Sequence, residues 1–134
     1  MSSLNAFLHP VQVENKEVVI SKRFMDNGKP VPFVIRPITE MENSQLIKKY
    51  TRKDKAGRDT LDRTEYAHAL VASAVVFPEL ANAELQKKYN VLGETSLLTE
   101  MLNVGEYAVL SQMVSELSGL NQDINTDMEE VKNE

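Results

Sequence analysis

Hydrophobic and polar positions change their spacing along the chain, and each change predicts a different element. Between residues 17 and 37, two runs rich in β-branched residues flank the dipeptide Asn27-Gly28. This arrangement predicts a β-hairpin, because Asn-Gly favours the tight turns that join antiparallel strands.

The turn also predicts which residues of the hairpin pair. If Asn27 and Gly28 form the turn, paired positions sum to 55, and three pairs follow: Phe24 with Val31, Lys22 with Phe33, and Ile20 with Ile35. One face would then be apolar, with Val18, Ile20, Phe24, Val31, Phe33 and Ile35. Prolines in the second strand lack the N–H that a further strand would need, so we predict an edge strand there.

Helical spacing follows the hairpin. Thr39 and Glu42 form a capping-box pattern, which predicts a helix over residues 40–52. Residues 53–60 are polar and predict an exposed loop. A second helix is expected from Asp62 until Phe77-Pro78 stops it, and its apolar second half predicts a central position. Three shorter helices are predicted over residues 81–89, 94–102 and 106–117, with glycines at their breaks.

Together these elements predict one α+β domain over residues 16–120. We expect an N-terminal β-hairpin packed against a mainly helical bundle of about five helices. Residues 1–15 show no regular period and predict a flexible leader. Residues 121–134 hold five acids and one lysine, which predicts a disordered acidic tail. A chain of 134 residues is long enough for one such core.

Composition narrows the classes of function. The chain has no cysteine, which excludes a thiolate nucleophile, a zinc–cysteine site and a disulfide scaffold. No run approaches the roughly 18 apolar residues of a membrane helix, and the first ten residues lack the basic start of a signal peptide. We therefore expect a cytoplasmic protein. The net charge of −5 disfavours nucleic acid and anionic lipid as partners of the whole surface.

Residue patterns typical of catalysis are missing. The glycines are placed for turns and helix breaks, so no Gly-rich loop remains to bind a phosphate. The two histidines are His9 and His68, and only Asp62 and Glu65 lie near His68 in sequence. A zinc site needs at least three converging ligands, so we interpret His68 as a packing or surface residue. We predict no catalytic residue, no cofactor and no metal, and thus a protein that is not an enzyme.

A basic segment over residues 48–58 has two interpretations. It holds six cations and one acid. Phosphate contacts with Tyr50 as a stacking platform would make it a nucleic-acid site. Alternatively, the cations complement a helix C-terminus and continue into a solvated loop. The apolar neighbours Leu46 and Ile47 favour the second interpretation, because they turn Tyr50 inward.

The C-terminal half contains a cluster of large apolar residues across Gly105. The cluster is either the core of a helical hairpin or an adaptable groove for apolar partner segments, since methionine fills irregular gaps. Both hold if the face is shared. We predict a partner surface that combines this cluster with the open side of the β-hairpin: Phe33, Met101, Leu102, Tyr107, Leu110 and Met113.

The order of motifs resembles the XkdN-like tail assembly chaperones of long-tailed phages and prophages. The similar runs are Asn5-Ala-Phe-Leu, Val-Val-Ile-Ser-Lys-Arg-Phe24, Asn27-Gly-Lys-Pro-Val-Pro-Phe, Ile35-Arg-Pro-Ile-Thr-Glu, Ala74-Val-Val-Phe-Pro-Glu-Leu, Ala83-Glu-Leu-Gln-Lys-Lys-Tyr and Leu97-Leu-Thr-Glu-Met-Leu-Asn-Val-Gly-Glu-Tyr107. They span about residues 4–120. Each motif is common by itself, whereas their order is fairly specific.

The resemblance implies a function for the chain. Such proteins are not enzymes. They bind the long tape-measure protein in the host cytoplasm, keep it soluble while tail-tube subunits polymerise, and are absent from the mature virion. A longer form made by frameshifting would recruit tail-tube protein. Two alternatives stay open: a nucleic-acid-binding phage accessory protein that uses residues 48–58, and a structural tail component. The oligomeric state also stays open, a homo-oligomer included.

Overall fold

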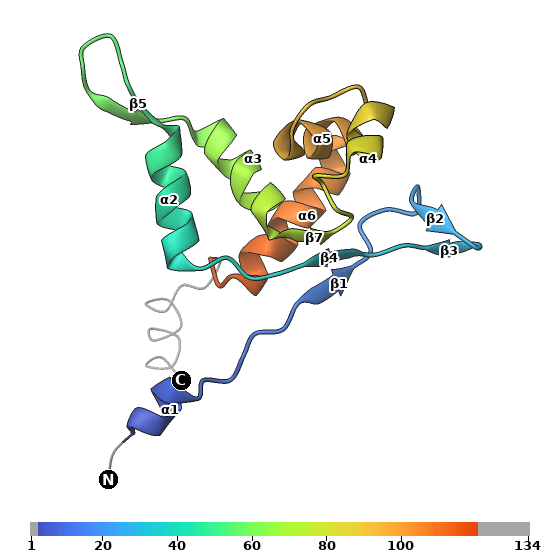
Figure 1. Cartoon of the computed structure of the whole chain (residues 1–134), viewed down its shortest axis with the longest axis horizontal. Helices are drawn as coiled ribbons and strands as arrows, with labels where there is room; N and C mark the ends of the chain where they lie inside the picture. The colour runs from blue at the N-terminus through green and yellow to red at the C-terminus, as the bar shows by residue number, and fades with distance from the viewer. Residues whose placement is uncertain (1–2, 121–134) are drawn as a thin grey trace, which may run out of the picture.

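The computed structural model describes residues 3–120 and confirms an α+β fold, in which a small sheet lies against a group of helices (Figure 1). The helices of this part are α1 Leu4–Leu8, α2 Glu40–Tyr50, α3 Arg63–Ala74, α4 Ala83–Lys88, α5 Glu94–Met101 and α6 Val104–Leu117. The strands are β1 Lys16–Val18, β2 Met25–Asp26, β3 Lys29–Pro30, β4 Phe33–Ile35, β5 Thr51–Lys53, β6 Asp59–Leu61 and β7 Val75–Phe77.

The predicted hairpin turn is present, but the predicted register holds only near it. Asn27 and Gly28 both have positive φ, and β2 pairs with β3 in the expected register. Farther from the turn, Val18 rather than Lys22 pairs with Phe33, and Lys16 rather than Ile20 pairs with Ile35. Residues 19–24 leave the ladder, and the resulting four-residue shift keeps the same side chains on the core face, because the faces of a strand alternate with period two.

The second hairpin strand is not the edge that the prolines predicted. The main sheet has the order β1-β4-β7, all antiparallel, so that β4 is its central strand. Pro30 and Pro32 both precede the residues of β4 that pair with β7, so their missing N–H groups do not block this pairing. Beyond the strand, the Arg36 N–H donates to the Ala74 carbonyl at 2.9 Å. Residues 75–77, predicted as the end of a helix, form β7 instead, since two consecutive valines favour an extended backbone.

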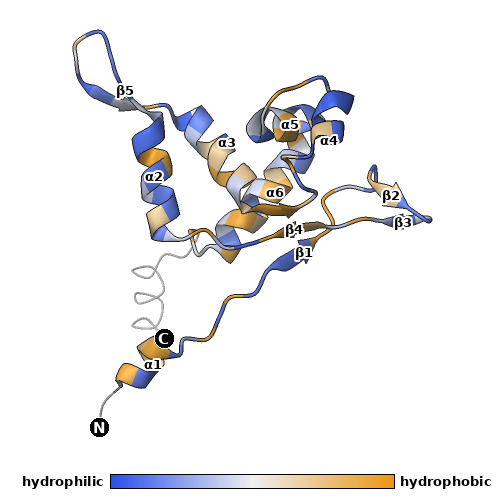
Figure 2. Cartoon of the chain, in the orientation of Figure 1, coloured by the Kyte–Doolittle hydropathy of each residue, from blue (hydrophilic) through white to orange (hydrophobic). Residues whose placement is uncertain are grey.

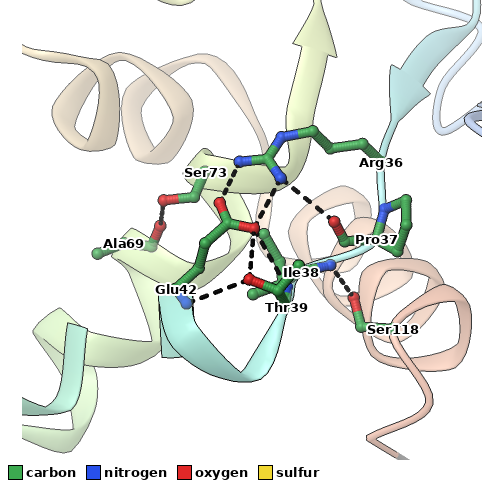
Figure 3. Close-up of polar contacts among 8 residues, drawn as sticks. All are labelled: Arg36, Pro37, Ile38, Thr39, Glu42, Ala69, Ser73 and Ser118. Atoms are coloured by element: carbon green, nitrogen blue, oxygen red, sulfur yellow. Dashed lines mark hydrogen bonds and ion pairs between the residues drawn. The ribbon is translucent and has the colours of Figure 1, made fainter. Parts of the chain in front are cut away.

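Helix α2 begins at the predicted capping box (Figure 3). The Glu42 N–H donates to Thr39 Oγ1 at 3.2 Å, and the Thr39 N–H donates to Glu42 Oε1 at 3.1 Å. Arg36 also donates to the Glu42 carboxylate, at 3.0 Å from Nη1. The end of α6 is attached to the same corner, because the Ile38 N–H donates to Ser118 Oγ at 2.9 Å. This corner joins the sheet, α2 and α6.

Helix α3 is central, as its apolar second half predicted. It begins at Asp62, whose side chain accepts from the Glu65 N–H, and it contacts α2, α5, α6 and β7. Its buried residues are Ala69, Leu70, Val71, Ala72 and Ala74. All of these except Ala69 belong to one core with residues of the sheet, of the chain between β7 and α4, and of the C-terminal helices: Val18, Phe33, Ile35, Ile38, Leu80, Leu97, Leu98, Met101, Leu102, Leu110 and Val114.

Two segments project from this core. The N-terminal segment contains the exposed helix α1 (Figure 1). The second segment follows the C-terminal end of α2, where the two sides of the predicted exposed loop pair as the antiparallel strands β5 and β6. The hydropathy colouring shows this hairpin as mostly hydrophilic (Figure 2). Gly105, predicted at a helix break, lies in the first turn of α6. No helix over residues 3–120 has the length and apolarity to cross a membrane. The acidic tail lies outside the described residues.

Candidate functional site

An open apolar pocket of about 210 Å³ lies between the N-terminal hairpin, the end of β7 and helices α4 and α5. Its lining consists of aromatic side chains, aliphatic side chains and prolines: Phe24, Val31, Pro32, Phe33, Phe77, Pro78, Leu85, Tyr89 and Met101. Tyr89 is the one ionisable residue of this set. A wall of this chemistry suits an uncharged apolar group and offers no acid–base pair.

Two features expose apolar surface at this pocket. The Phe24 and Phe33 rings lie 5.9 Å apart at a tilt of 58°, so that Phe33 is buried while Phe24 remains half-exposed. On the opposite wall, Phe77 is 49% exposed at the end of β7. Strand β7 is an edge of the sheet, which leaves its outer side without a strand partner among the described residues. The pocket thus has a half-exposed apolar side chain on each of two walls.

Arg23 attaches the hairpin wall to the C-terminal helices. Its guanidinium donates to Glu106 at 2.9 Å from Nε and to the Met101 carbonyl at 3.0 Å from Nη2. The same guanidinium lies 5.0 Å from the centroid of the Phe24 ring. Hydrogen bonds from Arg23, then Ser21 and the Asn103 N–H, lower the pKa of Glu106 to about 2. The carboxylate is therefore charged at neutral pH and pairs with the guanidinium there.

The predicted partner residues are divided between the pocket and the core. Phe33 and Met101 both line the pocket, although each is buried, at 3% and 5% exposure. Leu102 and Leu110 lie within the core. Tyr107 and Met113 are half-buried and pack against it. The structure thus brings the hairpin and the start of the C-terminal cluster together at one pocket, and the remaining four residues lie elsewhere.

His68 and Tyr107 form a contact that supports the packing interpretation of the histidine. Their rings meet edge to face at 5.3 Å. Burial raises the pKa of Tyr107 to about 12, and its hydroxyl has no hydrogen-bond partner within residues 3–120. Over residues 3–120, no three His, Asp or Glu side chains are close enough together to hold a metal ion.

The sequence interpretation missed most of the pocket. The sequence pattern predicts Phe77-Pro78 as a helix stop and residues 81–89 as a short helix, and it gives no indication that Leu85 and Tyr89 line a pocket. Their role depends on tertiary contacts between β7, α4 and the hairpin, which have no local sequence signal. Arg23 was likewise missed, because its partner Glu106 is 83 residues away.

The basic segment begins at the C-terminal end of α2, whereas Leu120, the last described residue, lies near the start of that helix. Lys48 and Lys49 are in the last turn of α2, and the other cations are on the β5–β6 hairpin. Tyr50 is half-buried, with the Lys49 ammonium 5.5 Å from its ring centroid. An aromatic platform for nucleic-acid bases would need a free ring face, so this geometry favours the interpretation of a solvated helix end.

Comparisons with known proteins agree with the order of motifs. A family model described as phage XkdN-like tail assembly chaperone protein matches residues 4–132. Among solved structures, the crystal structure of the protein YqbN is similar, with a TM-score of 0.72 and 28% sequence identity. The alignment covers 85% of this chain and 94% of that one. No curated protein matches the sequence significantly.

Proposed function

The chain belongs to the phage XkdN-like tail assembly chaperone family, and from this membership we propose that it binds the tape-measure protein and keeps it soluble during tail-tube assembly. Binding rather than bond chemistry is the proposed activity. The supporting observation is the apolar pocket, which joins Phe33 of the hairpin to Met101 of α5. We propose the host cytoplasm as the place of action and absence from the finished virion.

The pocket fits the chemistry of a long amphipathic partner. Such a chain exposes apolar side chains at regular intervals, and each would aggregate if left in water. A pocket of about 210 Å³ holds one or two side chains at a time, so single contacts are weak. Many copies along one partner bind tightly by avidity, and each copy can still leave as tube subunits arrive.

Co-expression with the tape-measure protein tests the proposal. The informative variant is Phe77→Ser, because this side chain lines the pocket yet is half-exposed, so its loss leaves the core intact. We expect wild-type protein to keep the tape-measure protein soluble and to co-purify with it. Phe77→Ser should weaken the complex roughly tenfold or more, as loss of a central aromatic contact does.

Val104→Ser is the matched control. Val104 is 90% exposed and lies outside the pocket lining, so its variant should bind as wild-type does. The proposal fails if wild-type protein leaves the tape-measure protein insoluble. The pocket assignment alone fails if both variants bind equally well. Mass analysis of purified virions separates a chaperone from a structural component, because a structural component is retained there.

The nucleic-acid alternative has a different salt response. Phosphate binding by the cations of residues 48–58 would weaken by nearly one log unit per contact for each tenfold rise in salt. Apolar capture in the pocket should respond little to salt. Titration of the purified complex with salt therefore distinguishes the two functions.

A further inference from the structure

The last turn of α2 and the β5–β6 hairpin, residues 48–61, project from the core and are mostly hydrophilic (Figure 2), and the proposed pocket does not use them. We call these residues the basic hairpin. It carries six cations and two carboxylates. Lys53 pairs with Asp59 at 2.8 Å and Arg58 with Asp54 at 3.2 Å, which accounts for both carboxylates.

The remaining cations have no acidic partner in the described part of the chain. The four cations Lys48, Lys49, Arg52 and Lys55 make no ion pair within residues 3–120. Even the paired cations are open to solvent, since the Lys53 and Arg58 side chains are 70% and 80% exposed. The basic hairpin therefore presents a concentrated positive charge on a protein whose net charge is −5.

We propose that the basic hairpin binds the acidic C-terminal segment of the same chain, residues 121–134. Charge complementarity supports this occupant, because that segment holds five acids and one lysine. Its acids are Asp123, Asp127, Glu129, Glu130 and Glu134. The surplus of four negative charges on the segment matches the surplus of four positive charges on the basic hairpin.

The point at which the described chain ends allows this contact. Leu120 lies beside Thr39 and Glu40, at the start of α2. The basic hairpin begins at the other end of α2, which is eleven residues or roughly 16 Å away. Three-residue strands and the turn extend the hairpin by roughly 10–15 Å more. The tip is thus about 30 Å from Leu120.

The C-terminal segment is long enough to cover this distance. Fourteen residues reach at most about 46–50 Å when extended. At about 3.3 Å per residue, Asp127 reaches roughly 23 Å beyond Leu120 and Glu130 roughly 33 Å, which spans the hairpin from its base to its tip. The contact needs no distortion of the described fold.

Tethering makes weak surface charges effective here. Single exposed ion pairs contribute little, but several pairs act together when the partner is held at a millimolar effective concentration. The contact should be sensitive to salt, since exposed charges are screened within about 10 Å at 0.1 M. The segment would thereby cover the basic hairpin against other anions, nucleic acid included.

Paramagnetic NMR on the full chain tests the proposal. The absence of cysteine allows one spin label to be placed in the C-terminal segment through Asn133→Cys. At low salt, we expect amide signals of residues 51–61 to lose intensity roughly twofold or more, and to recover when salt is raised to about 0.5 M. The matched control replaces Asp127 with Asn and Glu129, Glu130 and Glu134 with Gln, which keeps length and shape; its hairpin signals should stay intact.

A second measurement uses a single-stranded oligonucleotide of about 12 nucleotides as an anionic probe. If the segment covers the basic hairpin, the neutralised variant should bind this probe roughly tenfold more tightly than wild-type protein at low salt. Equal probe affinity overturns the proposal. So does hairpin broadening that persists in the neutralised variant. A mixed sample of spin-labelled protein and unlabelled protein gives the last outcome. If the hairpin signals broaden only through the label of another molecule, the contact belongs to a second copy and the proposal is overturned as well.

Discussion

Arg23 and Glu106 form a bidentate, hydrogen-bonded ion pair although 83 residues separate them in sequence. Arg23 lies in the segment that leaves the β1–β4 ladder, and Glu106 lies in the first turn of α6. Glu106 also accepts from the Asn103 N–H at 2.7 Å, so that one carboxylate caps its own helix and anchors the hairpin. The position of one pocket wall therefore depends on this pair.

Loss of this pair should loosen the hairpin without unfolding the core. In Arg23→Ala, we expect backbone amides of residues 19–26 to exchange hydrogen faster, with little change in α3, because the Arg23 side chain is half-exposed and its partner Glu106 lies on α6. Arg23→Lys should restore protection only partly, since an ammonium lacks the paired geometry of guanidinium. Hydrogen–deuterium exchange measures both.

Lys22→Ala is the control for this experiment. Lys22 is exposed and has no carboxylate partner within residues 3–120, so its variant should exchange as wild-type does. Uniform protection in all three variants would show that the ion pair does not hold the hairpin.

Stability should fall in acid because of two lowered carboxyl pKa values. Hydrogen bonds from Arg36 and Arg23 lower the pKa of Glu42 and Glu106 from 4.5 to about 2 in the folded protein. A carboxylate with a depressed folded-state pKa stabilises the protein fully above its unfolded value and loses that contribution as pH falls. The window is therefore from pH 4.5 down to about 2.

The double variant Glu42→Gln/Glu106→Gln tests this window. Urea unfolding should show that wild-type protein is more stable than the variant near neutral pH, and that the difference shrinks as pH falls from 4.5 to 2. A difference that stays constant across this range would contradict the ion-pair origin of the shifts. Added salt should reduce the difference, because both pairs are partly exposed.

Local patterns predicted the elements that local chemistry determines. The turn at Asn27-Gly28, the capping box of Thr39 and Glu42, and the central position of α3 are all correct, because each depends on residues within one or two turns. The same reasoning failed at β7, since a valine pair after an apolar helix fits either helix or strand. Only pairing with β4 decided between them.

The pocket was less predictable than the fold. Phe33 and Met101 are predicted as apolar partner residues on separate elements, and both line the same pocket. Their neighbours Phe77 and Leu85 follow from the packing of β7 and α4, which no spacing rule encodes. The C-terminal cluster was predicted either as the core of a helical hairpin or as a groove for a partner. Sequence alone did not show that Leu102 and Leu110 are buried in the core.

Substitution in α5 tests the core. Leu98 has no exposed surface, and it packs with α3 residues in one cluster. We expect Leu98→Ala to lower the free energy of unfolding by about 2–5 kcal/mol, through lost burial and the cavity that remains. Glu100→Ala, on the exposed side of the same helix, should change it by less than about 0.5 kcal/mol. Chemical denaturation gives both values, and equal effects would argue against the core position of Leu98.

Gly28 and Gly105 form a matched pair that tests whether the Asn27-Gly28 turn needs a positive φ. Gly28 has a φ of +77°, whereas Gly105 lies in the first helical turn of α6 without a positive φ. An added Cβ would meet no atom within 4 Å at either site, so steric crowding cannot distinguish them. Gly28→Ala should destabilise the protein by about 1–2 kcal/mol, because a side chain strains the left-handed turn. Gly105→Ala should be neutral or stabilise by up to about 1 kcal/mol, since alanine favours the helix. Opposite signs in urea unfolding would support the tight hairpin turn, and equal destabilisation would contradict it.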